Sequence, residues 1–383
     1  MLTAGDAVGL AQMLVRIDSR NPSLVPGGPG EEAVARVLAE TLAGWGFQVE
    51  VREVKPGRPN VIARVGGQGG RSLMLNGHLD VVGTEGMRHA PFGANERDGR
   101  LYGRGAADMK GGIAAMCAAA ARVAGSLAGE VIIAAVVDEE FESAGTSGLL
   151  AGGVRADAAI VTEPTGLAIM PAHRGFVWLE VTLHGRAAHG SRYDIGVDAI
   201  RSAGLLLHEL DIMDASELVR RTHPLLGHAS IHASEIDGGV GWSTYPDRCV
   251  LRLERRTVPG ETAHAVLQEV SAICDSIQSR RSEFRADVSL VFAQGPSDVA
   301  IDAPITRALA VAIGQEGYEA RIEGMSAWTD AALLNDAGIP AICFGPGDIS
   351  LAHSDEEWIS IGEVERATRT LARLIESWGS GEE

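Results

Sequence analysis

The chain has 383 residues, which at roughly 150 residues per domain is enough for two or three domains with a large buried core. Hydrophobic residues make up 45% of it and charged residues 22%, which is typical of a globular protein and excludes a disordered or fibrous one. The net charge of -18 at pH 7 repels polyphosphates and anionic lipids, so we expect neither nucleic acid nor a membrane as a partner.

The four cysteines lie far apart and form no CxxC motif, so we expect reduced, buried thiols. The first twenty residues lack a basic segment followed by an unbroken apolar one, which predicts no secretory signal and a cytoplasmic location. The longest apolar segment, residues 112–128, carries Arg122 and is shorter than a membrane span. We interpret it as a core helix.

In chain order, helical spacing of apolar residues over 31–45 predicts a helix, and the alternating segment FQVEVREV after it predicts a strand. NVIARV and SLMLN predict two more strands, before a glycine-rich stretch and an alanine-rich helix from Gly112. Continuous β-branched runs at 130–137 and 158–164 predict strands covered on both faces. Strands alternating with helices indicate an α/β domain with a mainly parallel sheet flanked by helices.

The pattern changes near Gly175, where FVWLEVTLHG, SIHASEIDGG and CVLRLERRT predict strands and DAIRSAGLLLHEL and AHAVLQEVSAICDSI predict helices. This is an antiparallel α+β module. After Pro296 the segments ITRALAVAIGQ, TDAALLNDAG and EVERATRTLARLIESW predict helices, and PAICFG predicts a strand. We therefore expect one α/β domain formed by residues 1–176 and 293–383, with an α+β domain of residues 177–292 inserted in it.

Three side chains that could take part in chemistry follow the first strands. His78 and Asp80 point to the same side of an extended chain, so Asp80 would accept a hydrogen bond from an imidazole whose other nitrogen ligates a metal. Asp108 stands on a glycine-rich turn that lacks the third glycine of a dinucleotide-binding loop. A structural histidine and a helix-capping aspartate remain the alternatives for these residues taken singly.

Later strand ends carry more acids. VIIAAVVDEE brings Glu139 and Glu140 to the carboxyl end of a buried strand, where their side chains point apart and so would serve as a base and a ligand. Glu163 closes AIVTEP, and His353 follows PAICFGPG. A solvated acidic turn or a surface histidine would explain each of them alone.

Taken together, these strand ends supply two imidazoles and three carboxylates, which suffice for two divalent ions that share one carboxylate. So dense a negative cluster would be costly without cations. The five candidate ligands are His78, Asp108, Glu140, Glu163 and His353.

In their order along the chain, GHLDVV, PFGANERDGRLYGRGAADMKGG, DEE, VTEPT, GRAAHGSR, ERRTVPGET, TDAALLNDAGIPAICFGPG and AHSDEEW resemble the motifs of the M20 metallopeptidases. That family includes acetylornithine deacetylase, succinyl-diaminopimelate desuccinylase, aminoacylase-1 and glutamate carboxypeptidase. The resemblance covers nearly the whole chain. It implies that residues 1–176 and 293–383 form a catalytic di-metal domain and that residues 177–292 form a lid and dimerisation domain.

The resemblance also assigns the ligands. It implies that His78, Asp108 and Glu163 hold one ion, and that Asp108, Glu140 and His353 hold the other, with Asp108 bridging. Zinc suits imidazole and carboxylate ligands, and cobalt or manganese would fit the same set.

Further roles follow from the same likeness. Glu139 would be the general base, and Asp80 the partner of His78. His189, in GRAAHGSR, matches a histidine that reaches the active site of the partner subunit, which implies a homodimer through the inserted domain. Arg256, in ERRTVPGET, matches an arginine that binds the substrate carboxylate. An exposed loop histidine and a surface ion pair are the alternatives for the last two residues.

The resemblance also implies that the peptide bond between Asp108 and Met109 is cis. Two departures from the family's pattern bear on the substrate: His89 lies where a tryptophan usually precedes the PF pair, and Ser243 stands where many relatives carry an asparagine.

The predicted function is hydrolysis of the amide bond of an N-acyl amino acid by a metal-bridged hydroxide, with Glu139 as the general base. A dipeptidase or carboxypeptidase on the same scaffold is the first alternative. A non-catalytic metal-binding relative is the second, and the intact Glu139 argues against it because such a protein needs no unliganded carboxylate beside the metals.

Overall fold

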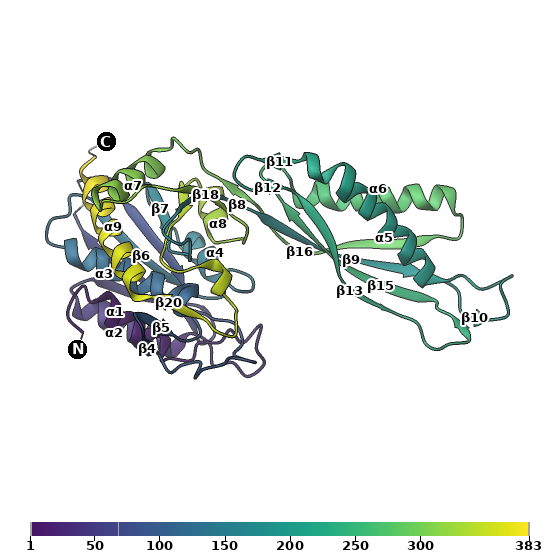
Figure 1. Ribbon diagram of the computed structural model, residues 1–383, viewed down its shortest axis with the longest axis horizontal. Coiled ribbons are helices and arrows are strands. Elements are labelled where there is room, and N and C mark those ends of the chain that lie inside the picture. Colours follow the sequence, from purple (N-terminus) through teal and green to yellow (C-terminus); the bar gives the residue numbers. More distant parts are fainter. Residues whose placement is uncertain (1, 68, 382–383) are drawn as a thin grey trace. The chain divides into compact units, whose positions relative to one another are not determined.

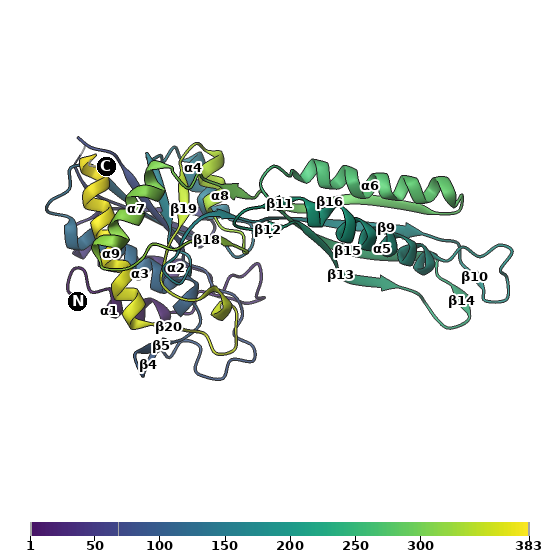
Figure 2. The same cartoon turned by 45° about the horizontal axis from the view of Figure 1, so that its top comes forward.

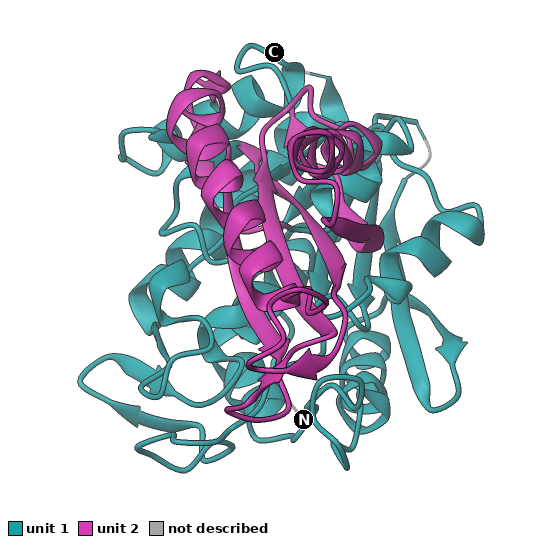
Figure 3. Ribbon diagram, turned by 90° about the vertical axis from the view of Figure 1, so that its right-hand side faces the viewer, with its two compact units in different colours: residues 1–171, 299–323, 329–383 teal, residues 172–298, 324–328 magenta. Residues whose placement is uncertain are grey.

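The computed structural model describes residues 2–67 and 69–381. The chain forms two compact units, shown in teal and magenta in Figure 3. The predicted domain boundaries lie at 176/177 and 292/293, a few residues from the positions where the chain passes between the units. The first unit comprises Met1–Pro171, Val299–Glu323 and Thr329–Glu383, and the second comprises Ala172–Asp298 and Gly324–Trp328.

The first unit is built on a sheet with the strand order β1-β2-β6-β3-β7-β19-β8 (Figure 1). Its central strands β6, β3, β7 and β19 run parallel, and the outer pairs are antiparallel. The prediction of an α/β fold with a mainly parallel sheet is confirmed. The strands are β1 (Gln48–Lys55), β2 (Arg58–Gly66), β3 (Leu73–His78), β6 (Glu130–Val136), β7 (Ala158–Val161), β8 (Ile169–His173) and β19 (Ala341–Cys343).

Helices cover both faces of this sheet. Five helices share one hydrophobic core with alternate strand residues such as Leu75, Ile133 and Ile160, and α4 and α8 pack on the strands outside that core. The five are α1 (Ala7–Val15), α2 (Glu32–Gly44), α3 (Gly111–Val123), α7 (Pro304–Gln315) and α9 (Ile361–Ser380), and the other two are α4 (Ala144–Ala151) and α8 (Ala331–Asp336).

The alanine-rich segment is the buried helix α3, as predicted, although it ends at Val123 rather than near residue 128. The four cysteines are free and buried, also as predicted. Within residues 2–67 and 69–381, no helix is both long and apolar enough to cross a membrane.

Several short elements complete the first unit and its junctions with the second. β4, β5 and β20 pair in a small separate sheet. They are β4 (Asn95–Arg97), β5 (Arg100–Tyr102) and β20 (Trp358–Ser360), and the remaining short strands are β17 (Ser297–Asp298) and β18 (Ile322–Met325).

The second unit is an antiparallel sheet in the order β13-β15-β9-β16, with α5 and α6 against one face (Figure 2). Val177, Leu179, Val181 and Leu183 alternate along β9 and lie in the core under these helices. The elements are β9 (Gly175–His184), β10 (Ala188–His189), α5 (Ala199–Ser216), β11 (Thr222–His223), β12 (Gly227–His228), β13 (Ser230–Gly238), β14 (Thr244–Tyr245), β15 (Arg248–Thr257), α6 (Ala263–Arg280) and β16 (Arg285–Gln294).

Candidate active site

The predicted site residues of the first unit come from the carboxyl ends of neighbouring parallel strands. His78 is the last residue of β3, Glu139 and Glu140 follow β6, and Glu163 follows β7. Because β6, β3 and β7 are adjacent and parallel, their carboxyl ends meet at one edge of the sheet. His353 lies in the loop after β19.

Asp108 reaches the same edge on a loop that Glu357 holds in place. The Glu357 carboxylate accepts hydrogen bonds from the backbone N–H groups of Ala107 (2.9 Å) and Asp108 (3.2 Å), and from Nη1 of Arg104 (2.7 Å). The peptide bond between Asp108 and Met109 is cis, as the resemblance implies. The buried Glu357 thus fixes the backbone that presents Asp108.

The structure brings the five predicted ligands together around Asp108. Its Oδ1 lies 3.1 Å from Nε2 of His78, and its Oδ2 lies 3.4 Å from Nε2 of His353. Nε2 of His353 is also 2.9 Å from Oε2 of Glu140, and Nε2 of His78 is 4.0 Å from Oε1 of Glu163. One carboxylate with an oxygen toward each histidine is the arrangement that a shared ligand requires.

Glu139 lies beside this group, with Oε2 3.8 Å from Nε2 of His78. Two sets of donor atoms each lie within 4.8 Å of one another: His78, Asp108 and Glu140 form one set, and His78, Glu139 and Glu163 form the other. Glu139 therefore lies close enough to exchange a proton with a group that the predicted ligands hold.

The electrostatics of the cluster favour a cation. Burial raises the pKa of Glu139 and of Glu163 well above the usual value, and neighbouring carboxylates raise both further. Burial also opposes ionisation of Asp108, but its hydrogen bonds with His353 and His78 outweigh this and lower its pKa. Carboxylates crowded in this way repel one another until a positive charge lies between them, so the donor set fits divalent metal ions.

The contacts of Asp80 differ from the expected one. Nδ1 of His78 lies 3.0 Å from the backbone carbonyl of Asp80 and 3.7 Å from its carboxylate, so the carbonyl is the closer hydrogen-bond acceptor. The Asp80 carboxylate instead accepts the backbone N–H groups of Glu139 and Glu140, both at 3.2 Å. Asp80 therefore orients His78 through its main chain and the two glutamates through its side chain.

Sequence reasoning missed a buried polar network behind Asp80. Nδ2 of Asn21 donates to Asp80 (2.8 Å) and to Asp138 (3.0 Å). Asp138 also pairs with Arg58 and Lys55, both at 2.8 Å. Asp138 is thus neutralised by structural partners. Its partners lie 80 or more positions away along the chain, so no local motif signals the network.

His189 and Arg256 belong to the second unit, and their approach to the predicted ligands stays a prediction. His189 is exposed on β10, where its Nδ1 accepts the backbone N–H of Ser191 at 3.2 Å. That bond leaves the proton of the neutral ring on Nε2, which is then a hydrogen-bond donor. Nε of Arg256 donates to Oε1 of Glu254 at 2.6 Å, and about a third of the Arg256 side chain is exposed (34%).

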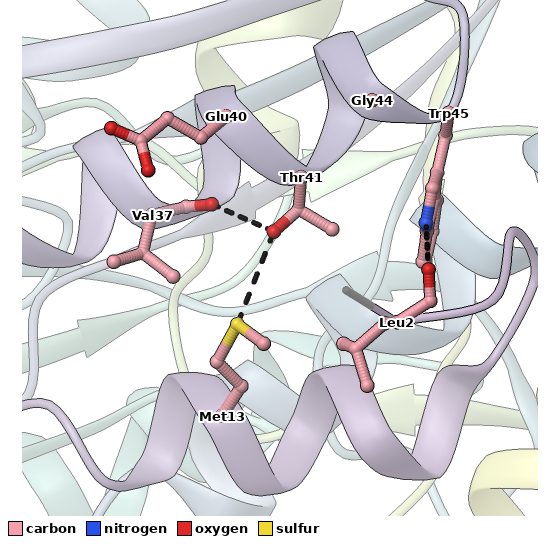
Figure 4. A pocket seen from close by; sticks show the side chains of 7 residues that line it. All are labelled: Leu2, Met13, Val37, Glu40, Thr41, Gly44 and Trp45. Atoms are coloured by element: carbon pink, nitrogen blue, oxygen red, sulfur yellow. Dashed lines mark hydrogen bonds between the residues drawn. The ribbon is translucent and has the colours of Figure 1, made fainter.

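A cavity of about 310 Å³ lies between α1 and α2, and its lining has no cluster of histidines and carboxylates (Figure 4). Thr41 in its wall donates to the carbonyl of Val37 at 2.8 Å, and Nε1 of Trp45 donates to the carbonyl of Leu2 at 3.3 Å. Glu40 is the one acidic residue among those that line the cavity, and no histidine or second carboxylate lies beside it in the lining. The lining therefore offers neither a metal site nor an acid–base pair.

Comparison with known proteins identifies a family for this chain. Residues 74–377 match the sequence profile of Peptidase family M20/M25/M40. An acetylornithine deacetylase of Myxococcus xanthus is 32% identical over 84% of each chain. The N-formyl-4-amino-5-aminomethyl-2-methylpyrimidine deformylase of Bacillus subtilis is 29% identical, over 93% of this chain and 91% of its own.

The fold agrees as well. The chain superimposes on a Bacillus subtilis protein described as a dinuclear metal-binding peptidase from the M20 family, with a TM-score of 0.73 and 17% identity, over 97% of this chain and 96% of that one.

The chain therefore belongs to Peptidase family M20/M25/M40, the family indicated by the motifs. It is a hydrolase of amide bonds, and its substrate is a small amide or peptide.

Proposed function

We propose that the protein is a di-metal deacylase that releases the amine from an N-acyl amino acid. The observation that carries the proposal is the cluster of two histidines and three carboxylates with Glu139 beside it. Two relatives at about 30% identity are named for removing an acetyl or a formyl group, which supports a small acyl group on this substrate.

Two divalent ions would be held by the five ligands. His78, Asp108 and Glu163 would hold one, and Asp108, Glu140 and His353 the other, with zinc first by ligand type and cobalt or manganese as alternatives. When bound, the ions supply Lewis-acid polarisation of the amide carbonyl and of water. The dinuclear site named in the Bacillus subtilis structure supports this stoichiometry.

Glu139 would transfer the proton from water to the leaving nitrogen. Burial raises the pKa of its carboxyl group, and a carboxyl group with a raised pKa both accepts a proton from water and returns it to the leaving nitrogen. Asp80 holds the backbone N–H of Glu139 and so aims this side chain.

The second unit would supply binding groups. The Nε2–H of His189 would stabilise negative charge on the carbonyl oxygen, and Arg256 would bind the substrate carboxylate. A homodimer through the second unit would bring His189 to the partner's site. An active protein that remains monomeric in sedimentation experiments would contradict this assembly.

The test is amine release from N-acetyl, N-formyl and N-succinyl amino acids and from dipeptides, with protein reconstituted with zinc, cobalt or manganese. Turnover of an N-acyl amino acid that chelation abolishes is the expected result. Cleavage of dipeptides alone would favour the second candidate, a dipeptidase, which the family's peptidases support. Silence across the panel from metal-loaded protein would contradict both.

A further inference from the structure

The small sheet of the first unit, β4-β5-β20, packs one face into the core and leaves the other facing outward (Figure 1). Leu101 on β5 and Ile359 on β20 are register partners, and both are buried in the hydrophobic core. Side chains alternate along a strand, so the neighbours of these two residues point away from the core. The register places Asn95, Arg97, Arg100, Tyr102 and Trp358 together on that outward face.

Two arginines stand directly opposite each other on this face. Arg97 on β4 and Arg100 on β5 are register partners across a tight turn, and like charges in that position repel each other. Nε of Arg97 lies 3.9 Å from Oδ2 of Asp98, which is beyond hydrogen-bond distance. Within residues 2–67 and 69–381, no carboxylate pairs with Arg100. The two guanidinium groups therefore keep a positive charge that no hydrogen-bonded carboxylate balances.

Aromatic rings of the same sheet hold both guanidinium groups in place. The guanidinium carbon of Arg97 lies 4.8 Å from the centroid of the Tyr102 ring, and that of Arg100 lies 3.9 Å from the centroid of the Trp358 ring. Hydrogen bonding to Arg97 and to Arg100 lowers the pKa of Tyr102, so both groups lie close to its hydroxyl oxygen. Each guanidinium group carries several N–H donors, and one hydroxyl oxygen accepts few of them.

These side chains line a hollow of about 490 Å³, a volume in the range of small-molecule sites. Its lining contains three arginines, Arg88, Arg97 and Arg100, and one carboxylate, Glu356. Arg88 is already paired with Glu356 at 3.0 Å and with Asp355 at 2.8 Å. The donors of Arg97 and Arg100 remain available for a ligand, although the chain as a whole carries a charge of -18.

We propose that this arginine hollow, lined by Arg88, Arg97, Arg100, Tyr102 and Trp358, binds the phosphate group of a small organic molecule. A phosphate group carries a charge of about −2 at pH 7, which matches the two opposed guanidinium groups, and guanidinium binds phosphate oxygens through paired N–H donors. The aromatic walls and the volume leave room for an organic part. Because the acidic chain repels long polyanions, the ligand is a small molecule rather than a nucleic acid.

The arginine hollow lies entirely within the first unit and contains none of the predicted metal ligands. The inference therefore goes beyond the proposed deacylase function and does not depend on it.

The first experiment measures binding to metal-loaded protein by isothermal titration calorimetry at low ionic strength. The probes are phenyl phosphate and phenyl sulfate, which have the same tetrahedral shape but differ by about one negative charge, and inorganic phosphate. Phenyl phosphate should bind about tenfold more tightly than phenyl sulfate, because the second charge strengthens the hydrogen bonds from the guanidinium groups. Equal affinities for these two, or no saturable binding of phenyl phosphate at millimolar concentrations, would overturn the proposal.

Inorganic phosphate distinguishes the two sources of the group. Weaker binding of inorganic phosphate than of phenyl phosphate supports an organic ligand that contacts the aromatic walls. Equal binding of the two supports the phosphate site and assigns it to free phosphate, which overturns the organic part of the proposal.

Variants separate the arginine hollow from the metal cluster, which would itself bind phosphate. Arg97→Gln and Arg100→Gln change exposed side chains, so the fold should survive, and each should weaken phenyl phosphate binding about tenfold. Arg36→Gln, exposed on α2, removes the same charge elsewhere in the first unit and should bind as the wild type does. Unchanged binding in both hollow variants, or an equal loss in the control, would overturn the proposal.

Turnover distinguishes a separate site from a part of the substrate site. Arg97→Gln and Arg100→Gln should release amine from N-acyl amino acids at the wild-type rate, and an equal fall of kcat/KM in both would instead assign the arginines to the substrate and overturn a separate site. Phenyl phosphate binding that depends on these arginines, without turnover of any N-acyl amino acid, supports the hollow and refutes the deacylase.

Discussion

Replacing Asn21 by alanine tests whether the buried network behind the site stabilises the first unit. Asn21 is fully buried and gives one hydrogen bond to each of two carboxylates, those of Asp80 and Asp138. A hydrogen bond to a charged group contributes about 1.5–3 kcal/mol. Asp138 keeps Arg58 and Lys55, and Asp80 keeps two backbone N–H groups, so each lost bond should cost near the lower end of this range. For the two bonds together, we expect the free energy of unfolding to fall by about 3 kcal/mol.

The assay is urea unfolding followed by circular dichroism, with a chelator present so that metal binding does not add to the stability. Asn21→Asp should cost more than Asn21→Ala, because it puts a third carboxylate against Asp80 and Asp138. The exposed Asn95→Ala is the control and should change the stability by less than about 0.5 kcal/mol. A loss of that small size in Asn21→Ala, or an Asn21→Asp variant as stable as the wild type, would refute the reasoning.

Three further predictions concern the site, the metals and pH. Glu139→Gln should retain its metal by elemental analysis while kcat falls about 10²–10⁴-fold, and a fall of less than tenfold would remove Glu139 from the proton transfer. His353→Ala should lower the bound metal from two ions to one per chain in equilibrium dialysis, whereas two retained ions would contradict its role as a ligand. Burial lowers the pKa of His173 to about 4, below its usual value near 6.5, so the unfolded state binds the proton more readily. Stability should therefore fall as the pH drops from about 6.5 to 4, by about 3 kcal/mol, and His173→Phe should lack this component of the urea-midpoint profile; an identical profile in the variant would exclude it.

The elements that periodicity predicts best are those with one strongly apolar face or with continuous burial. The segments of β6 and β7 read as buried strands because both faces are covered, and β9 alternates because only one face is. α1 and β16 were not predicted. Almost every residue of α1 is apolar, so its buried face does not stand out along the segment. Ala286, Val288 and Leu290 alternate along β16, but the register shifts between Leu290 and Phe292, and every position of the strand is half-buried or exposed.

In the candidate site, too, some residues could be predicted from the sequence and others could not. The meeting of His78, Glu140 and Glu163 could be predicted, because each follows a strand and the carboxyl ends of parallel strands lie at one edge of the sheet. The roles of Asn21 and Glu357 could not be predicted. Their partners are far away in sequence, and neither residue lies in a pattern that differs from a turn or a surface loop.

The sequence by itself therefore determined the family, the α/β class and the side chains with metal-binding chemistry, because these depend on residue types and on spacing along the chain. Only the tertiary structure decided which oxygen of Asp108 meets which histidine, that Asp80 contacts His78 mainly through its carbonyl, and that two arginines stack on the aromatic rings of the small sheet. Hydrogen-bond geometry and ring packing are set by how separate strands and loops pack, and a sequence pattern records neither.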